Sequence, residues 1–199
     1  MDCPFLMKVI RRVLFVPKFD SDGVPTKIAL ADLTKIAMQL RFNEEEPLDR
    51  IYPLPIIDNV TDERAEATYF EWDSGDQSFI QENPRSFTGM IKRITPELIG
   101  RVNIWTGKPA GFYAFDADGN FIYNQAPDGS TDLYPIYMDE ESIYSGLVKA
   151  TYSDPNMGAL KFMVPKGVKD SDLRWLKAST FDFDGLSKTD VFGLKEVNL

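Results

Sequence analysis

The sequence predicts a mainly β protein, namely a β-sandwich or barrel with two or three short helical insertions. Its 199 residues include 14 Phe, 8 Tyr and 3 Trp, and aromatic residues favour strands. Thirteen Gly and thirteen Pro are spread along the chain, which is typical of many short elements joined by turns. The helical segments interrupt the strands rather than alternate with them, so a parallel βαβ sheet is disfavoured.

The first element is a strand over residues 8–16 that ends at Pro17, and a turn cluster follows over 19–25. Residues 32–42 then have the strongest helical pattern, with Asp32 placed to act as N-cap. Three acids in the next five residues oppose the dipole at a helix C-terminus, so the helix ends there. The apolar residues at helical spacing are Leu33, Ile36, Ala37 and Leu40.

Residues 51–57 place two prolines among apolar residues, which is typical of an edge strand or an extended buried loop. A strand is expected over 64–72, followed by a turn over 73–76 and a returning strand over 77–81. Residues 86–92 alternate polar and apolar side chains and therefore predict a half-buried strand.

A second helix is expected to begin with Thr95 as N-cap and Pro96 as its first residue. Gly107 is placed to close its C-terminus. The residues that share one face of this helix are Leu98, Val102 and Trp105.

A hairpin is predicted next, with strands over 112–115 and 121–123 around the turn at 116–120. A polar loop covers residues 125–131.

Three further strands are expected over residues 133–138, 143–152 and 158–164. Asp170 or Ser171 is then placed to cap a short helix. The apolar residues of this helix are Leu173, Trp175 and Leu176.

The whole chain, residues 1–199, is expected to form a single β-rich domain. Residues 1–17 are expected to be an N-terminal arm or strand, and residues 179–199 a C-terminal arm that adds a strand or docks on a neighbouring subunit. Cys3 is the single cysteine, so neither an intramolecular disulfide nor a cysteine-rich metal site is expected.

The net charge of −9 disfavours stable binding of nucleic acid, because affinity for phosphates comes from Lys and Arg. The acidity suits either a surface past which DNA moves or simple solubility. No run of 18 apolar residues occurs and no secretory signal is evident, so a cytosol-like compartment and no membrane contact are expected. Lys8, Arg11 and Arg12 are candidates for a polyanion contact, or else belong to a solvated strand.

The chain contains no histidine, which removes the usual base at neutral pH and excludes Ser-His-Asp and Cys-His sites. Zinc and non-haem iron sites are nearly excluded as well. A glycosidase would need only two carboxylates. The candidate acids are Glu71, Asp73 and Asp76, then Asp139, Glu140 and Glu141, and finally Asp182 and Asp184.

Each acidic cluster lies in or beside a predicted turn, where carboxylates normally bond the local backbone. Residues 116–120 superficially resemble a calcium loop, but Gly119 comes two positions early and Pro127 stands where the loop needs Glu. A hairpin turn is the favoured interpretation there. We therefore predict that the protein is not an enzyme, with no catalytic residues, no metal and no cofactor.

Aromatic residues interleaved with Asp and Asn leave a carbohydrate-binding module as an alternative of another class. At strand spacing they are more typical of core and cross-strand packing. These residues are Phe112, Tyr113, Phe115, Phe121 and Tyr123.

Several turn-and-strand signatures occur in an order that resembles structural proteins of tailed bacteriophages, particularly those with Bacteroidota hosts. Among virion proteins the chain is most similar to tail-tube or related ring-forming subunits. The segments that carry the resemblance are Tyr52-Pro-Leu-Pro, Trp72-Asp-Ser-Gly75, Arg85-Ser-Phe-Thr-Gly89, Asp118-Gly-Asn120, Leu133-Tyr-Pro-Ile136 and Lys149-Ala-Thr151.

The resemblance implies a β-sandwich or barrel that forms hexameric rings, which stack into a tube through which DNA passes without specific binding. It implies a homo-oligomer with other virion proteins as partners, located in the virion after assembly in the host cytoplasm. The chain is longer than a minimal tube subunit, so a head-to-tail connector, a tail terminator or a minor capsid protein stays open.

Overall fold

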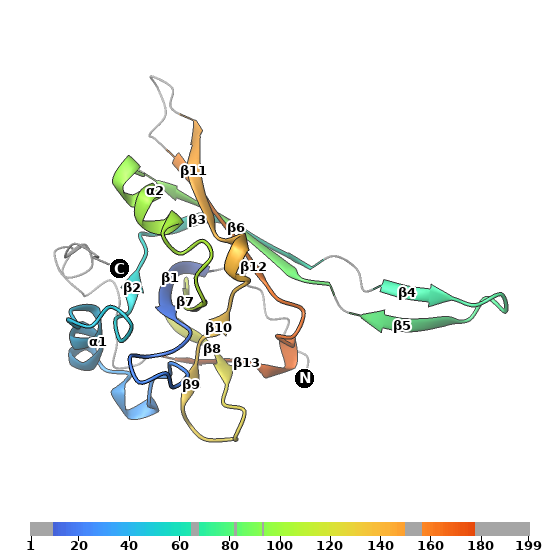
Figure 1. Cartoon of the computed structure of the whole chain (residues 1–199), viewed down its shortest axis with the longest axis horizontal. Helices are drawn as coiled ribbons and strands as arrows, with labels where there is room; N and C mark the ends of the chain where they lie inside the picture. Colours follow the sequence, from blue (N-terminus) through green and yellow to red (C-terminus); the bar gives the residue numbers. More distant parts are fainter. Residues whose placement is uncertain (1–9, 65–67, 82, 93, 150–156, 178–199) are drawn as a thin grey trace.

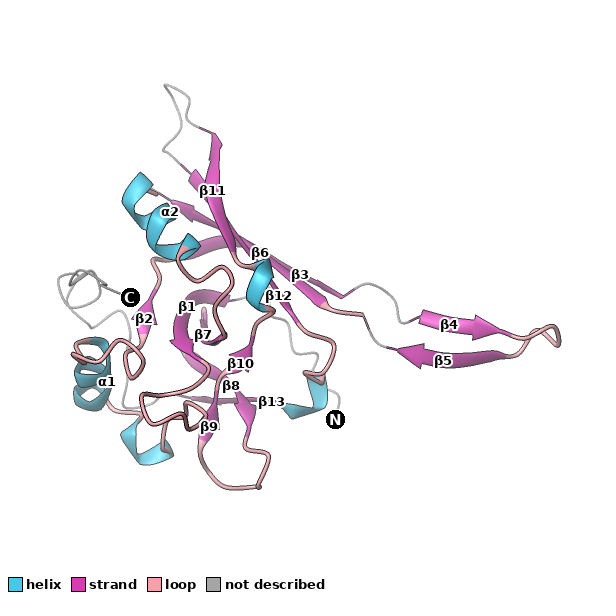
Figure 2. Cartoon of the chain, in the orientation of Figure 1, coloured by secondary structure: helices cyan, strands magenta, loops and turns pink. Residues whose placement is uncertain are grey.

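Two antiparallel sheets packed face to face, together with a separate two-stranded hairpin, make up most of the computed structural model (Figure 1). The structure describes residues 10–64, 68–81, 83–92, 94–149 and 157–177. In these residues the protein is mainly β, with two α-helices and a sandwich-like arrangement, which confirms the predicted fold class (Figure 2).

Thirteen strands are assigned in the described residues. They are β1 Ile10–Pro17, β2 Tyr52–Pro53, β3 Ile57–Arg64, β4 Thr68–Glu71, β5 Gln77–Gln81, β6 Arg85–Lys92, β7 Ala110–Asp116, β8 Asn120–Gln125, β9 Leu133–Tyr134, β10 Ile136–Tyr137, β11 Tyr144–Lys149, β12 Met157–Val164 and β13 Leu173–Lys177. The helices are α1 Lys35–Phe42 and α2 Pro96–Asn103, with 3₁₀ turns at η2 Leu30–Asp32, η3 Glu140–Ser142 and η4 Asp170–Asp172.

The larger sheet has the order β13-β8-β7-β1-β2. The strand predicted over 133–138 is divided at Pro135 into β9, which pairs with β8, and β10, which pairs with β7. Proline has no N–H to give to a ladder. Gly111 of β7 permits the close approach, since a Cβ at this position would lie 2.8 Å from Cβ of Pro135.

The smaller sheet has the order β11-β12-β6-β3, and every pair in it is antiparallel. β3 is a strand that the sequence does not predict over most of its length, because its sequence IDNVTDER is polar. The ladder between β3 and β6 shifts register between Asp58 and Thr61, beside Asn59, whose φ is +52°. A polar edge strand with a bulge is poorly identified by apolar periodicity.

The main core fills the space between the two sheets. Phe162 of β12 stacks on Phe87 of β6, with ring centroids 4.4 Å apart, and lies 4.9 Å from the ring of Phe112 of β7. Phe15 of β1 meets the ring of Phe162 edge-on at 5.9 Å. These four fully buried aromatic rings join the sheets at their centre.

The larger sheet is buried on its second face too. There Leu14 and Val16 of β1 pack with Met38 and Phe42 of α1. Burial on both faces explains why β1 is almost continuously apolar.

Helix α1 differs from its prediction in both cap and buried face. Thr34 rather than Asp32 is the N-cap, and its side chain accepts a hydrogen bond from the Ala37 N–H at 3.3 Å. Ile36 and Leu40, predicted to face the core, are exposed. Met38 and Phe42 are buried instead, because this face of the helix packs on Leu14 and Val16 of β1.

Helix α2 begins as predicted, but it ends earlier than predicted, with Ile104 rather than Gly107 as its C-cap. The Thr95 side chain accepts a hydrogen bond from the Leu98 N–H at 3.2 Å, and Pro96 is the first helical residue. Val102 and Trp105 are buried against the main core, and Gly107 has a φ of +78°.

The helix predicted after Asp170 is wrong. A 3₁₀ turn at η4 leads into strand β13, which pairs antiparallel with β8 and sets Trp175 opposite Ile122. The apolar spacing of this short segment fits a helix or a strand. The segment forms a strand because it pairs with an edge of β8.

Residues 10–17 form a central strand, so the strand alternative for the N-terminal segment holds for that part. Residues 1–9 and the predicted C-terminal arm at 179–199 lie outside the described residues. No helix in the described part of the chain is long and apolar enough to cross a membrane.

Candidate interaction surface

The β4–β5 hairpin projects from the body of the protein as an arm (Figure 1). It continues the β3–β6 pair outward, since Arg64 and Arg85 are the last partners in that ladder. Within the described residues β4 and β5 pair only with each other. Every residue of β4 is exposed, so this strand contributes no side chain to either core.

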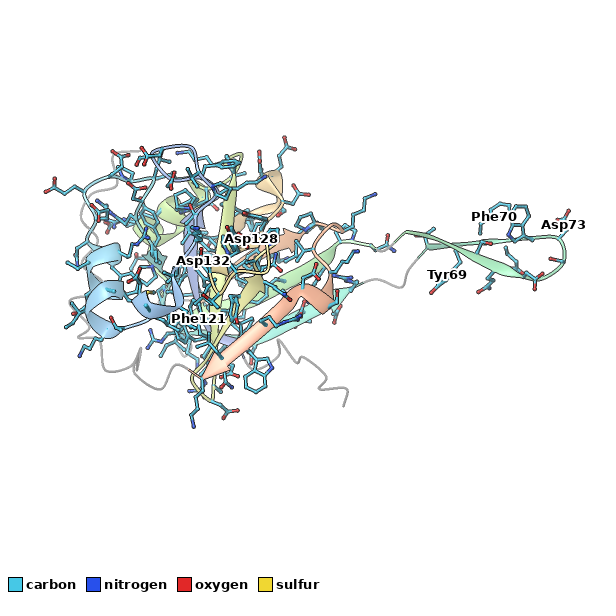
Figure 3. The ribbon with its side chains drawn as sticks, turned by 90° about the horizontal axis from the view of Figure 1, so that it is seen from below. Tyr69, Phe70, Asp73, Phe121, Asp128 and Asp132 are labelled. Atoms are coloured by element: carbon cyan, nitrogen blue, oxygen red, sulfur yellow. The ribbon has the colours of Figure 1, made fainter. Side chains whose placement is uncertain are left out.

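Large aromatic side chains lie uncovered along this arm. Phe70 and Trp72 are 50% and 54% exposed, and Tyr69 is 54% exposed. Phe70 and Trp72 meet edge-on with ring centroids 4.9 Å apart. Figure 3 shows Tyr69 and Phe70 on opposite sides of the arm, so both faces present an aromatic ring.

The end of the arm is an ordered turn. The Trp72 N–H donates to the Asp76 carbonyl, and the Gly75 N–H donates to the Trp72 carbonyl, both at 2.8 Å. Gly75 has a φ of +84°, which glycine adopts without strain. The Trp72 indole N–H donates to Ser78 Oγ at 2.8 Å, which fixes the ring on one face of the hairpin.

Charged groups fix the root of the arm. Arg85 Nε lies 3.1 Å from Asp62 Oδ1, and these side chains are only 11% and 6% exposed. Arg64 Nη2 donates to the Val168 carbonyl at 3.2 Å, which ties β3 to the turn after β12. The Asp62–Arg85 pair and the Arg64 bond thus hold the outer ends of β3 and β6, where the arm begins.

The arm is acidic. Residues 68–81 carry Glu71, Asp73 and Asp76 and contain no Lys or Arg. Asp76 accepts a hydrogen bond from Ser74 Oγ at 2.9 Å, and Asp73 lies at the far end (Figure 3). An aromatic and acidic surface is suited to a partner that is both apolar and basic.

The opposite charge balance occurs in residues 157–177. Only two acids, Asp170 and Asp172, occur in this segment of an otherwise acidic chain. The segment ends in β13, where Trp175 is 54% exposed. Its basic residues are Lys161, Lys166, Lys169, Arg174 and Lys177.

Several of the acids that were candidates for catalysis or calcium binding have local roles in turns. Asp116 Oδ1 accepts from the N–H groups of Asp118 at 2.9 Å and Asn120 at 2.8 Å, which confirms the hairpin turn. Asp139 caps the η3 turn by accepting from the Glu141 N–H at 3.4 Å. In the described residues no three carboxylates or cysteines converge on a metal-binding geometry. Cys3, Lys8, Asp182 and Asp184 lie outside those residues.

Four of the five aromatic residues considered for ligand stacking are buried in the cores. Tyr113 stacks on Phe121 with centroids 5.1 Å apart, and its hydroxyl donates to the Leu133 carbonyl at 2.8 Å. Phe112 and Phe115 are also buried, while Tyr123 is half-buried. Core packing, the favoured interpretation, is therefore confirmed for these four. Of the two arginines considered as a polyanion contact, Arg11 is exposed on β1 and Arg12 is half-buried.

Sequence reasoning located both strands of the arm but not their projection. A signal was present, since Tyr69 and Phe70 are adjacent in β4 and therefore point to opposite faces of the strand.

The fold and this surface define a class, a sandwich-like β protein whose most exposed element is a hairpin arm. Comparison of the sequence with known protein families and with curated proteins finds no match.

Proposed function

We propose that this chain is a non-catalytic structural subunit of a tailed-phage virion, which assembles into stacked hexameric rings of the tail-tube kind around a DNA conduit. The observation that carries the proposal is the projecting arm with its exposed aromatic residues. The resemblance of the turn-and-strand signatures supplies the virion setting.

A two-stranded hairpin is marginally stable in water on its own, and three or more strands or a packing partner are needed to stabilise it. The arm has an ordered turn and a fixed root, yet half of each aromatic side chain is in solvent. A partner surface would supply the missing burial.

The position of the arm favours rings or tubes. The arm leaves one end of the molecule, and a partner copy would receive it on a different surface (Figure 1). A contact between two different patches is head-to-tail, and repetition of it produces closed rings or helical filaments.

The charge suits a conduit for DNA. A net charge of −9 repels phosphates and so lets DNA pass without tight binding. The local roles of Asp116 and Asp139 support a non-catalytic subunit, because these acids already serve turns. A carbohydrate-binding module is less well supported, because the aromatic residues that suggested it are buried and cannot stack on a sugar. These are Phe112, Tyr113, Phe115 and Phe121.

Sedimentation velocity over a wide concentration range, with negative-stain electron microscopy of the same samples, tests the proposal. We expect oligomers of defined mass and rings or tubes in the images. A chain that stays monomeric at every concentration, with no ring or tube visible, would overturn the proposal.

A further inference from the structure

We propose that the arm of one copy docks along the free edge of β13 in a second copy. The acidic, aromatic hairpin would add its strand beside the basic, tryptophan-bearing strand at residues 173–177. This inference rests on the proposed self-assembly and names the two surfaces that meet in it.

The arm and the segment that contains β13 carry opposite charges. Residues 68–81 carry three carboxylates and no base, whereas residues 157–177 carry five basic side chains and two acids. Lys169, Arg174 and Lys177 are exposed around β13. Potentials of opposite sign steer two surfaces together and fix their register.

The arm and β13 both have a strand edge that is unpaired among the described residues. β13 is the outermost strand of its sheet and pairs with β8 alone among the described residues. The arm strands have four and five residues, and β13 has five. Addition of a strand to such an edge is a common mode of recognition, because main-chain hydrogen bonds provide affinity and side chains provide selectivity.

The other edges of the two main sheets are less suited to an acidic strand. β2 has two residues, and one is Pro53. β3 carries Asp58, Asp62 and Glu63 as well as a register shift. β11 exposes Tyr144, Leu147 and Val148, but its strand carries one basic residue, Lys149, against three acids at 139–141 shortly before it. Prolines, bulges and charges of the same sign each oppose pairing with this arm.

The apolar groove on the body, with a volume of about 660 Å³, fits the arm less well than β13 does. Its lining includes Leu48 and Trp105, but also the acids Asp20 and Glu46, against Lys108 as its single base. Like charges at its rim would oppose an arm with three carboxylates.

Both surfaces also carry half-exposed aromatic side chains. Trp175 is 54% exposed beside Arg174, whose guanidinium is held by the Ser171 carbonyl and Gln125 Oε1, both at 2.5 Å. Consecutive strand residues point to opposite faces, so a strand added at this edge can set Phe70 or Trp72 edge-to-face against Trp175 on one face and a carboxylate near Arg174 on the other.

The arm cannot satisfy this site within its own chain. It continues β3 and β6 away from the body in both orientations of the molecule (Figures 1 and 3). The acceptor is therefore the β13 edge of a second copy.

The test is a charge exchange in the full-length chain. One variant carries Glu71→Lys and Asp73→Lys on the arm, and the other carries Lys169→Glu and Lys177→Glu on the body. Each alone should weaken self-association by roughly tenfold to a hundredfold, because attractive pairs become repulsive. An equimolar mixture of the two variants should recover association, measured by sedimentation velocity. Asp22→Lys with Asp32→Lys is the matched control, since it makes the same charge change at exposed sites elsewhere.

The outcomes separate the two proposals. Self-association of each variant at the strength of the unchanged protein, or a mixture no stronger than either variant alone, would overturn the β13 site while leaving self-assembly intact. A monomeric unchanged protein would instead overturn the proposed function. Thermal unfolding of each variant at the temperature of the unchanged protein shows that folding is not the cause.

Discussion

Replacing the two paired aromatic residues of the arm should separate assembly from folding. The change is Phe70→Ser with Trp72→Ser. About half of each side chain is already covered within the arm, which leaves roughly 100 Å² apiece for a partner if such side chains bury about 150–250 Å² in full. At about 25 cal/mol per Å², complete burial of that remainder is worth about 5 kcal/mol.

Incomplete burial lowers that value, so we expect a loss of about 3–5 kcal/mol of association free energy, or roughly a hundredfold to several-thousandfold in affinity. The body should be unaffected, because Phe70 and Trp72 belong to neither core cluster and every residue of β4 is exposed. The free energy of unfolding should therefore change by no more than about 0.5 kcal/mol, as for other surface substitutions.

Sedimentation velocity measures the association, and urea unfolding measures the stability of the body. Tyr144→Ser is the matched control, because Tyr144 is an equally exposed aromatic residue outside the arm, at 56%. Unchanged association in the Phe70 and Trp72 variant would refute the reasoning, and so would an equal loss in the Tyr144 variant.

Two further predictions concern the body. Burial raises the pKa of the Tyr113 hydroxyl well above its usual value of about 10, so the unfolded chain loses this proton first as the pH rises. Stability should be full below about pH 10 and fall above it. Tyr113→Phe should reduce that fall, measured by urea unfolding across this range; an unchanged pH dependence would contradict the assignment. Burial also raises the pKa values of the half-buried Tyr52 and Tyr137, so part of the fall in stability should remain in the Tyr113 variant. Phe162→Ala should cost about 3–5 kcal/mol, because it empties the junction between the rings of Phe87 and Phe112. A loss below about 1 kcal/mol in urea unfolding would show that this junction is not the centre of the core.

The sequence predicted those parts of the fold in which local signals agree with the tertiary environment. Thr95 and Pro96 begin α2 as expected, and the turn at Asp116 joins β7 to β8. In these places the cap or turn residue is itself the structural cause, so no distant contact is needed to predict it.

Prediction failed where distant contacts decide. Trp175 lies in a segment whose spacing fits a helix or a strand, and pairing with β8 chose the strand. In α1 the exposure of Ile36 and Leu40 reverses the expected face, because the helix begins after Thr34 and packs through Met38. The arm is the extreme case, since strand periodicity predicts its pairing but contains no information on its distance from the core.

Whether the arm makes rings or simple dimers depends on where its acceptor lies. Two copies could exchange arms reciprocally, which closes a dimer with two-fold symmetry and leaves no surface for growth. An arm that points away from its own body favours the other solution, in which each copy gives an arm to one neighbour and receives one from another (Figure 1). Every copy then has one occupied arm and one occupied β13 edge, and the angle between these two elements sets the number of subunits in a ring. In the proposed assembly an acidic chain would associate with itself through a local site of opposite charge, which the basic segment at 157–177 offers to the acidic arm.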